Sequence, residues 1–190
     1  MIGLTGVIII ATAASLSASD AQVTYKDLMR EAKSCKYAKK PPSDALLKSL
    51  VEVEKSFNPP ESVRGMVLAA ACMESGFNPK AKGDHKFSKS GKKPMAIGIL
   101  QMWKYFETGY TIDRTDPVQS ARAWMTHISK QVPKVKRQCR YRKPYKVWVA
   151  AWVTGIRYKK PGGRCKERPK HLRLLRKWHK NIKKQFSKKF

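Results

Sequence analysis

A single acidic residue interrupts an apolar stretch near the middle of the chain. Residues 67–79 read VLAAACMESGFNP, and Glu74 is the only charged side chain among them. Val63, Val67, Ala70 and Glu74 share one face of a helix with 3.6 residues per turn. A carboxyl group that continues an apolar stripe is expected to be partly desolvated, which favours its protonated form. Cleavage of a glycosidic bond needs such a proton donor. The structural alternatives are that Glu74 faces solvent at the helix end, or that it pairs with a nearby Lys or Arg.

The elements that must position Glu74 read mostly as helices. Thr24 or its neighbours can cap a helix over residues 25–35, and Ser43 can cap a second one that carries apolar residues to Phe57. Pro60 suits the first turn of a third helix that runs to about Ser75. Gly76 is a fitting stop for that helix.

The sequence of the second half of the chain predicts a polar loop followed by further helices. Residues 78–94 are rich in Gly and Lys, and a long loop of this kind often lines a site. We expect a short helix over 95–107, a helix from Asp116-Pro117 to about 132, ended by Pro133, and a buried helix over 145–155. The last helix would bury Leu172, Leu175, Trp178, Ile182 and Phe186. The pattern predicts a mainly α fold, with room for a short β-hairpin in 78–97 or 156–166.

The first residues read as an export signal. An apolar segment precedes small residues around Ser19-Asp20-Ala21, which favours cleavage after Ala21, and an uncleaved membrane anchor is the alternative. Residues 22–190 would then form a single domain that buries roughly 70% of its unfolded surface. The protein is expected to be secreted or periplasmic.

The four cysteines are Cys35, Cys72, Cys139 and Cys165, an even number behind an export signal. This favours two disulfides, for which three pairings exist. We favour Cys139–Cys165, which closes a basic loop, and hence Cys35–Cys72. The spacing matches no zinc motif, so we expect no metal.

Two short motifs resemble the lytic transglycosylase family, which has a lysozyme-like fold. Glu74, Ser75, Phe77, Asn78 and Pro79 match the Glu-Ser-x-aromatic-Asn-Pro motif of the family. A Gly-rich turn ending in Gln follows in the family, and here it is matched by Ala96, Gly98 and Gln101. The resemblance covers about residues 45–160, and the Asp-Pro helix start at 116 is also typical of it. The resemblance implies a single lysozyme-like catalytic domain with a basic C-terminal helix.

The resemblance also implies which residues form the site. Glu74 takes the role of the lone catalytic acid and base, and the substrate cleft is expected to contain Ser75, Gly98, Gln101, Met102 and Trp152. Further aromatic candidates for stacking on sugars are Tyr105, Tyr110, Trp124 and Trp148. The chain departs from the family at Val153, where the family has Asn, and after Gln101, where the family has Pro-Thr.

The reaction implied by the resemblance cuts the bond between N-acetylmuramic acid and N-acetylglucosamine in peptidoglycan. The C6 hydroxyl of the muramic acid attacks internally and forms a 1,6-anhydro ring, so no second carboxylate and no cofactor are needed. Asp84 is a possible second carboxylate, because a loop can fold over a cleft. If it activated a water, the enzyme would be a hydrolase of lysozyme type. The alternative for Asp84 is a turn residue in the Gly-Asp pair.

The charge of the chain indicates an anionic partner. Its 190 residues include 41 Lys and Arg against 13 Asp and Glu, which gives a net charge of +28. We expect a monomer that binds peptidoglycan strands and the anionic surface of the cell wall. Nucleic acid is disfavoured by the export signal, the cysteines and the absence of a recognised motif. A catalytically inactive cationic wall-binding protein is the remaining alternative.

Overall fold

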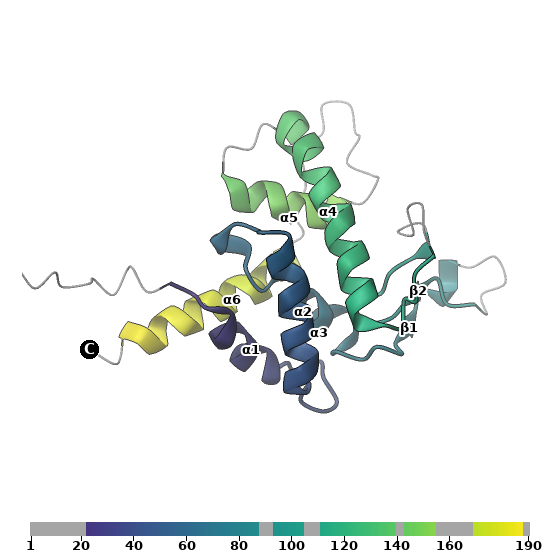
Figure 1. Cartoon of the computed structure of the whole chain (residues 1–190), viewed down its shortest axis with the longest axis horizontal. Helices are drawn as coiled ribbons and strands as arrows, with labels where there is room; N and C mark the ends of the chain where they lie inside the picture. The colour runs from purple at the N-terminus through teal and green to yellow at the C-terminus, as the bar shows by residue number, and fades with distance from the viewer. Residues whose placement is uncertain (1–21, 88–92, 105–110, 140–142, 155–168, 188–190) are drawn as a thin grey trace, which may run out of the picture.

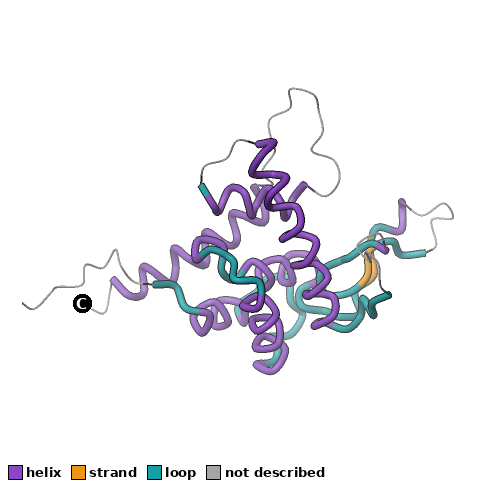
Figure 2. Tube along the Cα trace, turned by 45° about the horizontal axis from the view of Figure 1, so that its top comes forward, coloured by secondary structure: helices purple, strands orange, loops and turns teal. Residues whose placement is uncertain are grey.

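The computed structural model describes residues 22–87, 93–104, 111–139, 143–154 and 169–187. Within these ranges the chain is mainly helical and contains one two-stranded antiparallel sheet (Figures 1 and 2). The prediction of a mainly α fold with a short hairpin is therefore confirmed.

The first two helices begin at the predicted caps. Helix α1 (Tyr25–Lys33) starts after Thr24, whose hydroxyl oxygen accepts a hydrogen bond from the N–H of Asp27 at 3.2 Å. Helix α2 (Asp44–Ser56) starts after Ser43, whose hydroxyl oxygen accepts from the N–H of Leu46 at 3.2 Å. Both bonds satisfy N–H groups that have no partner within the helix.

The third helix is shorter than predicted. Residues 61–63 form a single 3₁₀ turn, η2 (Glu61–Val63), and the α-helix α3 (Met66–Ser75) begins only after Gly65. Gly65 has φ of +84°, a left-handed conformation that breaks the helix between the two segments. Gly76, with φ of +61°, ends α3 as expected.

Helix α3 lies at the centre of the core. All residues from Met66 to Cys72 are buried, and the helix packs against α1, α2 and the C-terminal helix α6 (Pro169–Ser187). Because its surroundings are apolar on all sides, α3 needs no polar face over its first two turns. The helix therefore offers a rigid support for whatever its C-terminal turn carries.

Two further helices cover the core. In helix α4 (Pro117–Cys139), Asp116 caps the start by accepting from the N–H groups of Val118 and Gln119 at 2.8 and 2.9 Å. The predicted end at Pro133 is wrong: Pro133 lies inside α4, on the exposed side, and Val135 beyond it is buried, which holds the last turns on the core. Helix α5 (Pro144–Thr154) packs on α4 and buries Val147, Val149, Ala150 and Ala151, in line with the predicted buried helix.

The hairpin consists of β1 (Lys82–Gly83) and β2 (Ala96–Ile97), with a 3₁₀ turn, η3 (His85–Phe87), after β1. The hairpin and the turn after it, residues 82–87 and 93–104, are called the hairpin lobe below. Figure 1 shows this lobe on one side of α3, with α1 and α6 on the other. The predicted helix over 95–107 is wrong for the described part of that range. Ile97 and Met102 exchange two backbone hydrogen bonds around a turn, of 3.0 and 2.9 Å, in place of helical ones.

The disulfide between Cys35 and Cys72 is present, as predicted, and joins the end of α1 to α3. Cys165, the predicted partner of Cys139, and the signal segment 1–21 lie outside the described part of the structure. Among the helices that the structure describes, none is long and apolar enough to cross a membrane.

Candidate functional site

Glu74 lies in the last turn of α3 with its side chain exposed. Val63, Val67 and Ala70 are fully buried, so the apolar stripe predicted from the sequence is real, but it ends before Glu74. The expected partial desolvation of Glu74 is therefore wrong: α3 leaves the core in its last turn and presents the carboxyl group at the surface. A carboxyl in this place is accessible to a large substrate and is held by a helix that is otherwise fixed in the core.

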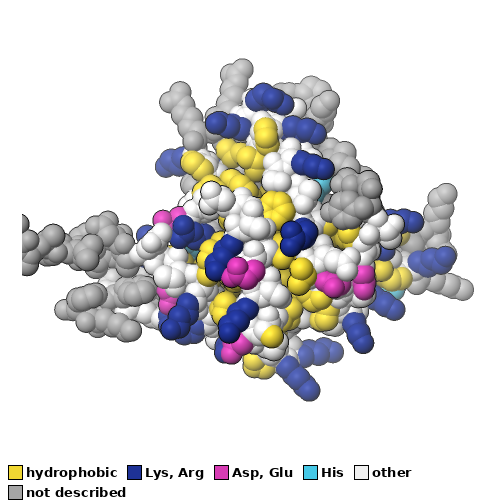
Figure 3. Space-filling view, in the orientation of Figure 1, with side chains coloured by type: hydrophobic (Ala, Val, Ile, Leu, Met, Phe, Trp, Pro, Cys, Tyr) yellow, Lys and Arg dark blue, Asp and Glu magenta, His cyan; other side chains and the backbone are white. Residues whose placement is uncertain are grey.

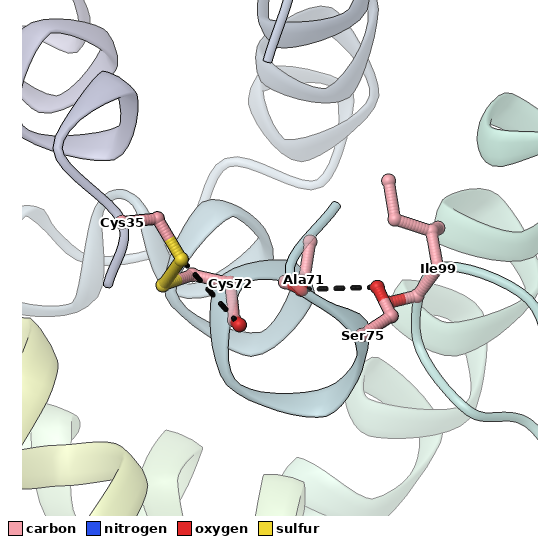
Figure 4. Close-up of a disulfide and its surroundings, with 5 residues drawn as sticks. All are labelled: Cys35, Ala71, Cys72, Ser75 and Ile99. Carbon is pink, nitrogen blue, oxygen red and sulfur yellow. Dashed lines mark hydrogen bonds between the residues drawn. A yellow bond between two sulfur atoms is a disulfide. The ribbon is translucent and has the colours of Figure 1, made fainter. Parts of the chain in front are cut away.

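Ser75 joins the end of α3 to the hairpin lobe. Its hydroxyl lies 2.8 Å from the carbonyl oxygen of Ile99 and 3.2 Å from that of Ala71 (Figure 4). The hydroxyl carries one proton, and the shorter contact marks Ile99 as the main acceptor. The residue after Glu74 thus fixes the end of α3 relative to this lobe.

Helix α3 is also fixed to the chain after α1. The disulfide attaches Cys72, about one turn before Ser75 on the same helix, to Cys35 (Figure 4). The Cys35 sulfur also lies 3.5 Å from the Cys72 carbonyl oxygen, a contact and not a hydrogen bond, because a disulfide sulfur has no proton. At Gly76 a Cβ would collide with the carbonyl of Tyr37, so the two segments touch through their backbones.

Gln101 organises the turn that follows β2. It has φ of +48°, and its side-chain amide donates to the carbonyl oxygen of Gly98 at 3.0 Å. Its amide oxygen lies directly over Gly83 of β1, where a Cβ would collide with it. Gly98 itself has φ of +83° and lies against the carbonyl of Arg114. The two motif residues Gly98 and Gln101 therefore shape one turn beside Ser75, and Gln101 is partly buried within it.

Arg114 holds this turn from outside, a role the sequence analysis did not foresee. Its guanidinium donates to the carbonyl oxygens of Met95 and Met102 at 3.2 and 3.0 Å. One side chain thus clamps the start of β2 and the end of the turn. The sequence offered little signal for this, since Arg114 is one of many basic residues.

Asp84 is tied to an aromatic side chain. Its carboxylate oxygen Oδ2 accepts a hydrogen bond from the indole Nε1 of Trp103 at 2.9 Å. Asp84 has φ of +56°, in keeping with the prediction of a turn residue, since Asp tolerates this conformation better than most residues. Trp103 is half-buried and extends the surface of the lobe that carries Gln101. The sequence analysis missed Trp103 as an aromatic candidate.

The remaining predicted residues are distributed less favourably. Met102 is fully buried, and its sulfur accepts a hydrogen bond from Ser120 at 3.3 Å, so its side chain belongs to the core. Trp124 is also buried, and Trp148 packs partly buried against the core. The other candidates lie outside the described residues and side chains: Tyr105, Tyr110, Trp152 and Val153.

A second carboxylate that the sequence analysis missed is Glu54 of α2, which is completely buried. It accepts hydrogen bonds from the N–H groups of Gly65 and Val67 at 2.6 and 2.8 Å, and from the Tyr25 hydroxyl at 3.2 Å. Burial raises the pKa of Glu54 to about 7, because the loss of hydration outweighs these bonds. It caps the start of α3, the end of the helix opposite to Glu74.

The signal for Glu54 was present in the sequence. Leu47, Leu50 and Val51 precede it by seven, four and three residues, the same helical spacing that singled out Glu74. Helical spacing behind apolar residues therefore selects both Glu54 and Glu74. Glu54 is buried and structural, whereas Glu74 is exposed at a helix end.

The structure thus joins Ser75, the residue after Glu74, to the turn that contains Gly98 and Gln101, with Asp84 and Trp103 hydrogen-bonded on the same lobe. No group of three or more His, Cys, Asp or Glu side chains that could hold a metal is found in the described ranges. Comparisons with protein-family models, curated proteins and solved structures found no match for this chain.

Proposed function

We propose that the protein is a lytic transglycosylase that cuts peptidoglycan, with Glu74 as its acid and base. One observation carries the proposal: an exposed carboxylate ends a buried helix, and the next residue, Ser75, bonds the lobe that carries Gln101. This arrangement supports a cleft between the helix end and the lobe, in which a sugar strand meets a single carboxyl group.

In the proposed reaction the glycosidic bond of the muramic acid breaks as Glu74 gives its proton to the bridging oxygen. The leaving N-acetylglucosamine departs with a free 4-hydroxyl. The ionised Glu74 then takes the proton of the C6 hydroxyl while that oxygen bonds to C1. The acid is restored at the end, and no water is consumed.

The positive charge supports attraction to the wall. The chain carries a net charge of +28, and Figure 3 shows Lys and Arg side chains spread over the visible face with fewer acidic ones. Such a surface attracts an anionic polymer through long-range forces that salt screens. The disulfide is consistent with a secreted or periplasmic protein, which we propose acts outside the cytoplasm as a monomer.

Digestion of purified peptidoglycan tests the proposal. The protein from residue 22 onward is compared with Glu74→Gln, and with Glu61→Gln as a matched change at an exposed glutamate of η2. We expect anhydro products, lighter by one water than reducing-end products, from the unchanged protein and from Glu61→Gln. We expect activity to fall by about 100-fold or more in Glu74→Gln.

Two results would overturn the assignment in different ways. Reducing-end products would identify a hydrolase and direct attention to Asp84. Equal inactivity of the unchanged protein and Glu74→Gln, with retained binding to the wall, would identify a wall-binding protein without catalysis.

A further inference from the structure

A cavity of about 530 Å³ lies between α1, the chain after it, the last turn of α3 and α6. Figures 1 and 2 show α1 and α6 beside each other on the side of α3 away from the hairpin. We propose that this cavity binds the peptide of peptidoglycan, the carboxylate-bearing stem attached to the muramic acid. The inference rests on the proposed function and names the part of the substrate that a second site would recognise.

The charge of the cavity favours an anionic ligand. Lys36, Arg173 and Lys177 are exposed and line it. The acidic residue among the lining side chains is Glu31, whose carboxylate accepts a hydrogen bond from the amide of Asn181 at 3.0 Å. Lys36 and Lys177 alone outnumber the one carboxylate of the lining, so the mouth carries an excess of positive charge. Free carboxylates of a peptide would pair with these side chains.

The inner surface of the cavity is apolar. Trp178 is only 4% exposed and Leu174 is partly buried, and both line the cavity together with Met73 and Cys35. Tyr37 stands at the edge with 44% of its surface exposed, and the Lys36 ammonium lies 5.0 Å from the centre of its ring. An apolar floor with a cationic rim suits a short peptide with small apolar side chains and carboxylates, better than it suits a bare polyanion.

The cavity lies next to the candidate catalytic residue. Met73 lines it, and Glu74 follows Met73 on the same helix turn, about 100° further round the axis. The muramic acid that would be cut at Glu74 carries the stem on its lactyl group. A stem of about five residues spans at most roughly 17 Å when extended. This length exceeds the roughly 10 Å diameter of a helix, so a stem can pass round the last turn of α3 from a cleft on the hairpin side to the cavity on the other side.

The walls of the cavity are fixed relative to Glu74. The disulfide holds the chain after α1 against α3, and the backbone of Tyr37 touches Gly76 directly. A ligand in the cavity would therefore be positioned relative to the cleft, and recognition of the stem would set the register of the sugar chain.

Binding is tested in the Glu74→Gln protein, so that cutting does not interfere. The probes are a soluble glycan fragment that carries stem peptides and the same fragment after enzymatic removal of the peptides. We expect the peptide-bearing fragment to bind more tightly. Lys177→Glu should weaken its binding by roughly tenfold, because a favourable charged contact becomes repulsive. Binding of the peptide-free fragment should change little.

Lys184→Glu is the matched control. Lys184 is also an exposed lysine of α6, two turns further along, and the change in net charge is the same. Equal affinity for both fragments, or equal loss in Lys177→Glu and Lys184→Glu, would overturn the inference and leave only general attraction. Failure of the proposed function is read separately, as the absence of anhydro products from the unchanged protein.

Discussion

The indole N–H of Trp103 donates a hydrogen bond to the carboxylate of Asp84 at 2.9 Å. One of the two oxygens of Asp84 thus serves to orient an aromatic ring on the lobe opposite Glu74. This gives Asp84 a structural use that needs a hydrogen-bond acceptor and not a charge. The effect of removing the charge of Asp84 therefore distinguishes transglycosylase activity from hydrolase activity.

Replacement of Asp84 distinguishes these two uses. Asp84→Asn keeps an acceptor oxygen and a side chain that tolerates positive φ, so we expect activity within about threefold of the unchanged protein and anhydro products. Asp84→Ala removes the acceptor, and we expect the KM for soluble glycan to rise severalfold. A loss of about 100-fold in Asp84→Asn, measured in the same digest, would instead indicate a catalytic carboxylate.

Ser75→Ala tests the link between the helix end and the hairpin lobe. Loss of the bond to Ile99 should lower kcat/KM by about tenfold with a loss of stability of only about 1 kcal/mol. Ser56→Ala is a matched control, because Ser56 also ends its helix and donates within it, to the carbonyl of Val53 at 2.7 Å. If both variants lose activity in proportion to stability, Ser75 has no positioning role.

Glu54 makes stability depend on pH. Its pKa is raised to about 7 from the ordinary 4.5, so between these values the folded state binds more protons than the unfolded state. Stability should therefore fall as pH rises through this window, by roughly 3 kcal/mol in all from Glu54. Burial lowers the pKa of His127 and His179 from the ordinary 6.5. Their contribution to stability therefore has the opposite sign to that of Glu54, because it increases as pH rises toward 6.5.

The contribution of Glu54 to the pH dependence of stability is obtained by comparing the unchanged protein with two variants. Urea unfolding at pH 5 and pH 8 is measured for the unchanged protein, Glu54→Gln and Glu61→Gln. We expect the free energy of unfolding to fall between pH 5 and pH 8 by more in the unchanged protein and in Glu61→Gln than in Glu54→Gln, because the glutamine has no proton to lose. Identical pH profiles in all three proteins would mean that Glu54 is ionised in the folded state throughout this range.

Gly76→Ala should damage the end of α3 more than Gly65→Ala damages its start. Both glycines have positive φ, so both changes introduce backbone strain of about 1 kcal/mol. A Cβ at Gly76 also meets the backbone carbonyl of Tyr37, whereas one at Gly65 meets the movable side chain of Leu28 at 2.9 Å. Thermal unfolding should show the larger loss in Gly76→Ala, and similar losses would contradict the close backbone approach.

The local features of the fold could be predicted from the sequence, and the non-local ones could not. Thr24, Ser43 and Asp116 were recognised as caps because capping needs only a side chain and the N–H groups of the next turn. Residues 95–102 were expected to be helical from their apolar composition. They form a strand and a turn because Gly98 and Gln101 contact segments around Ala81 and Arg114, which lie far from them in sequence.

The candidate site also contains residues that the sequence predicts and residues that it does not. Ser75, Gly98 and Gln101 were found through their motif, and the structure brings them together. The motif also includes Glu74, but its expected desolvation depends on helical spacing, which does not tell where a helix leaves the core. Trp103 and Arg114 were missed because their roles depend on partners 12 to 19 residues away, which nothing in their own neighbourhood indicates.

The disulfide also has a topological consequence. Residues 35–72 form a covalent ring that contains all of α2, the buried Glu54 and both backbone groups that bind it. Lys39 and Lys40 are exposed on this ring, between α1 and α2. Trypsin cuts poorly before proline, and Pro41 follows Lys40, so the bond after Lys39 is the one open to it. A single cut there opens the backbone but leaves the two pieces joined through Cys35 and Cys72. The nicked protein would run as one chain on a gel until it is reduced, and Glu74 would keep its place at the end of an uncut helix.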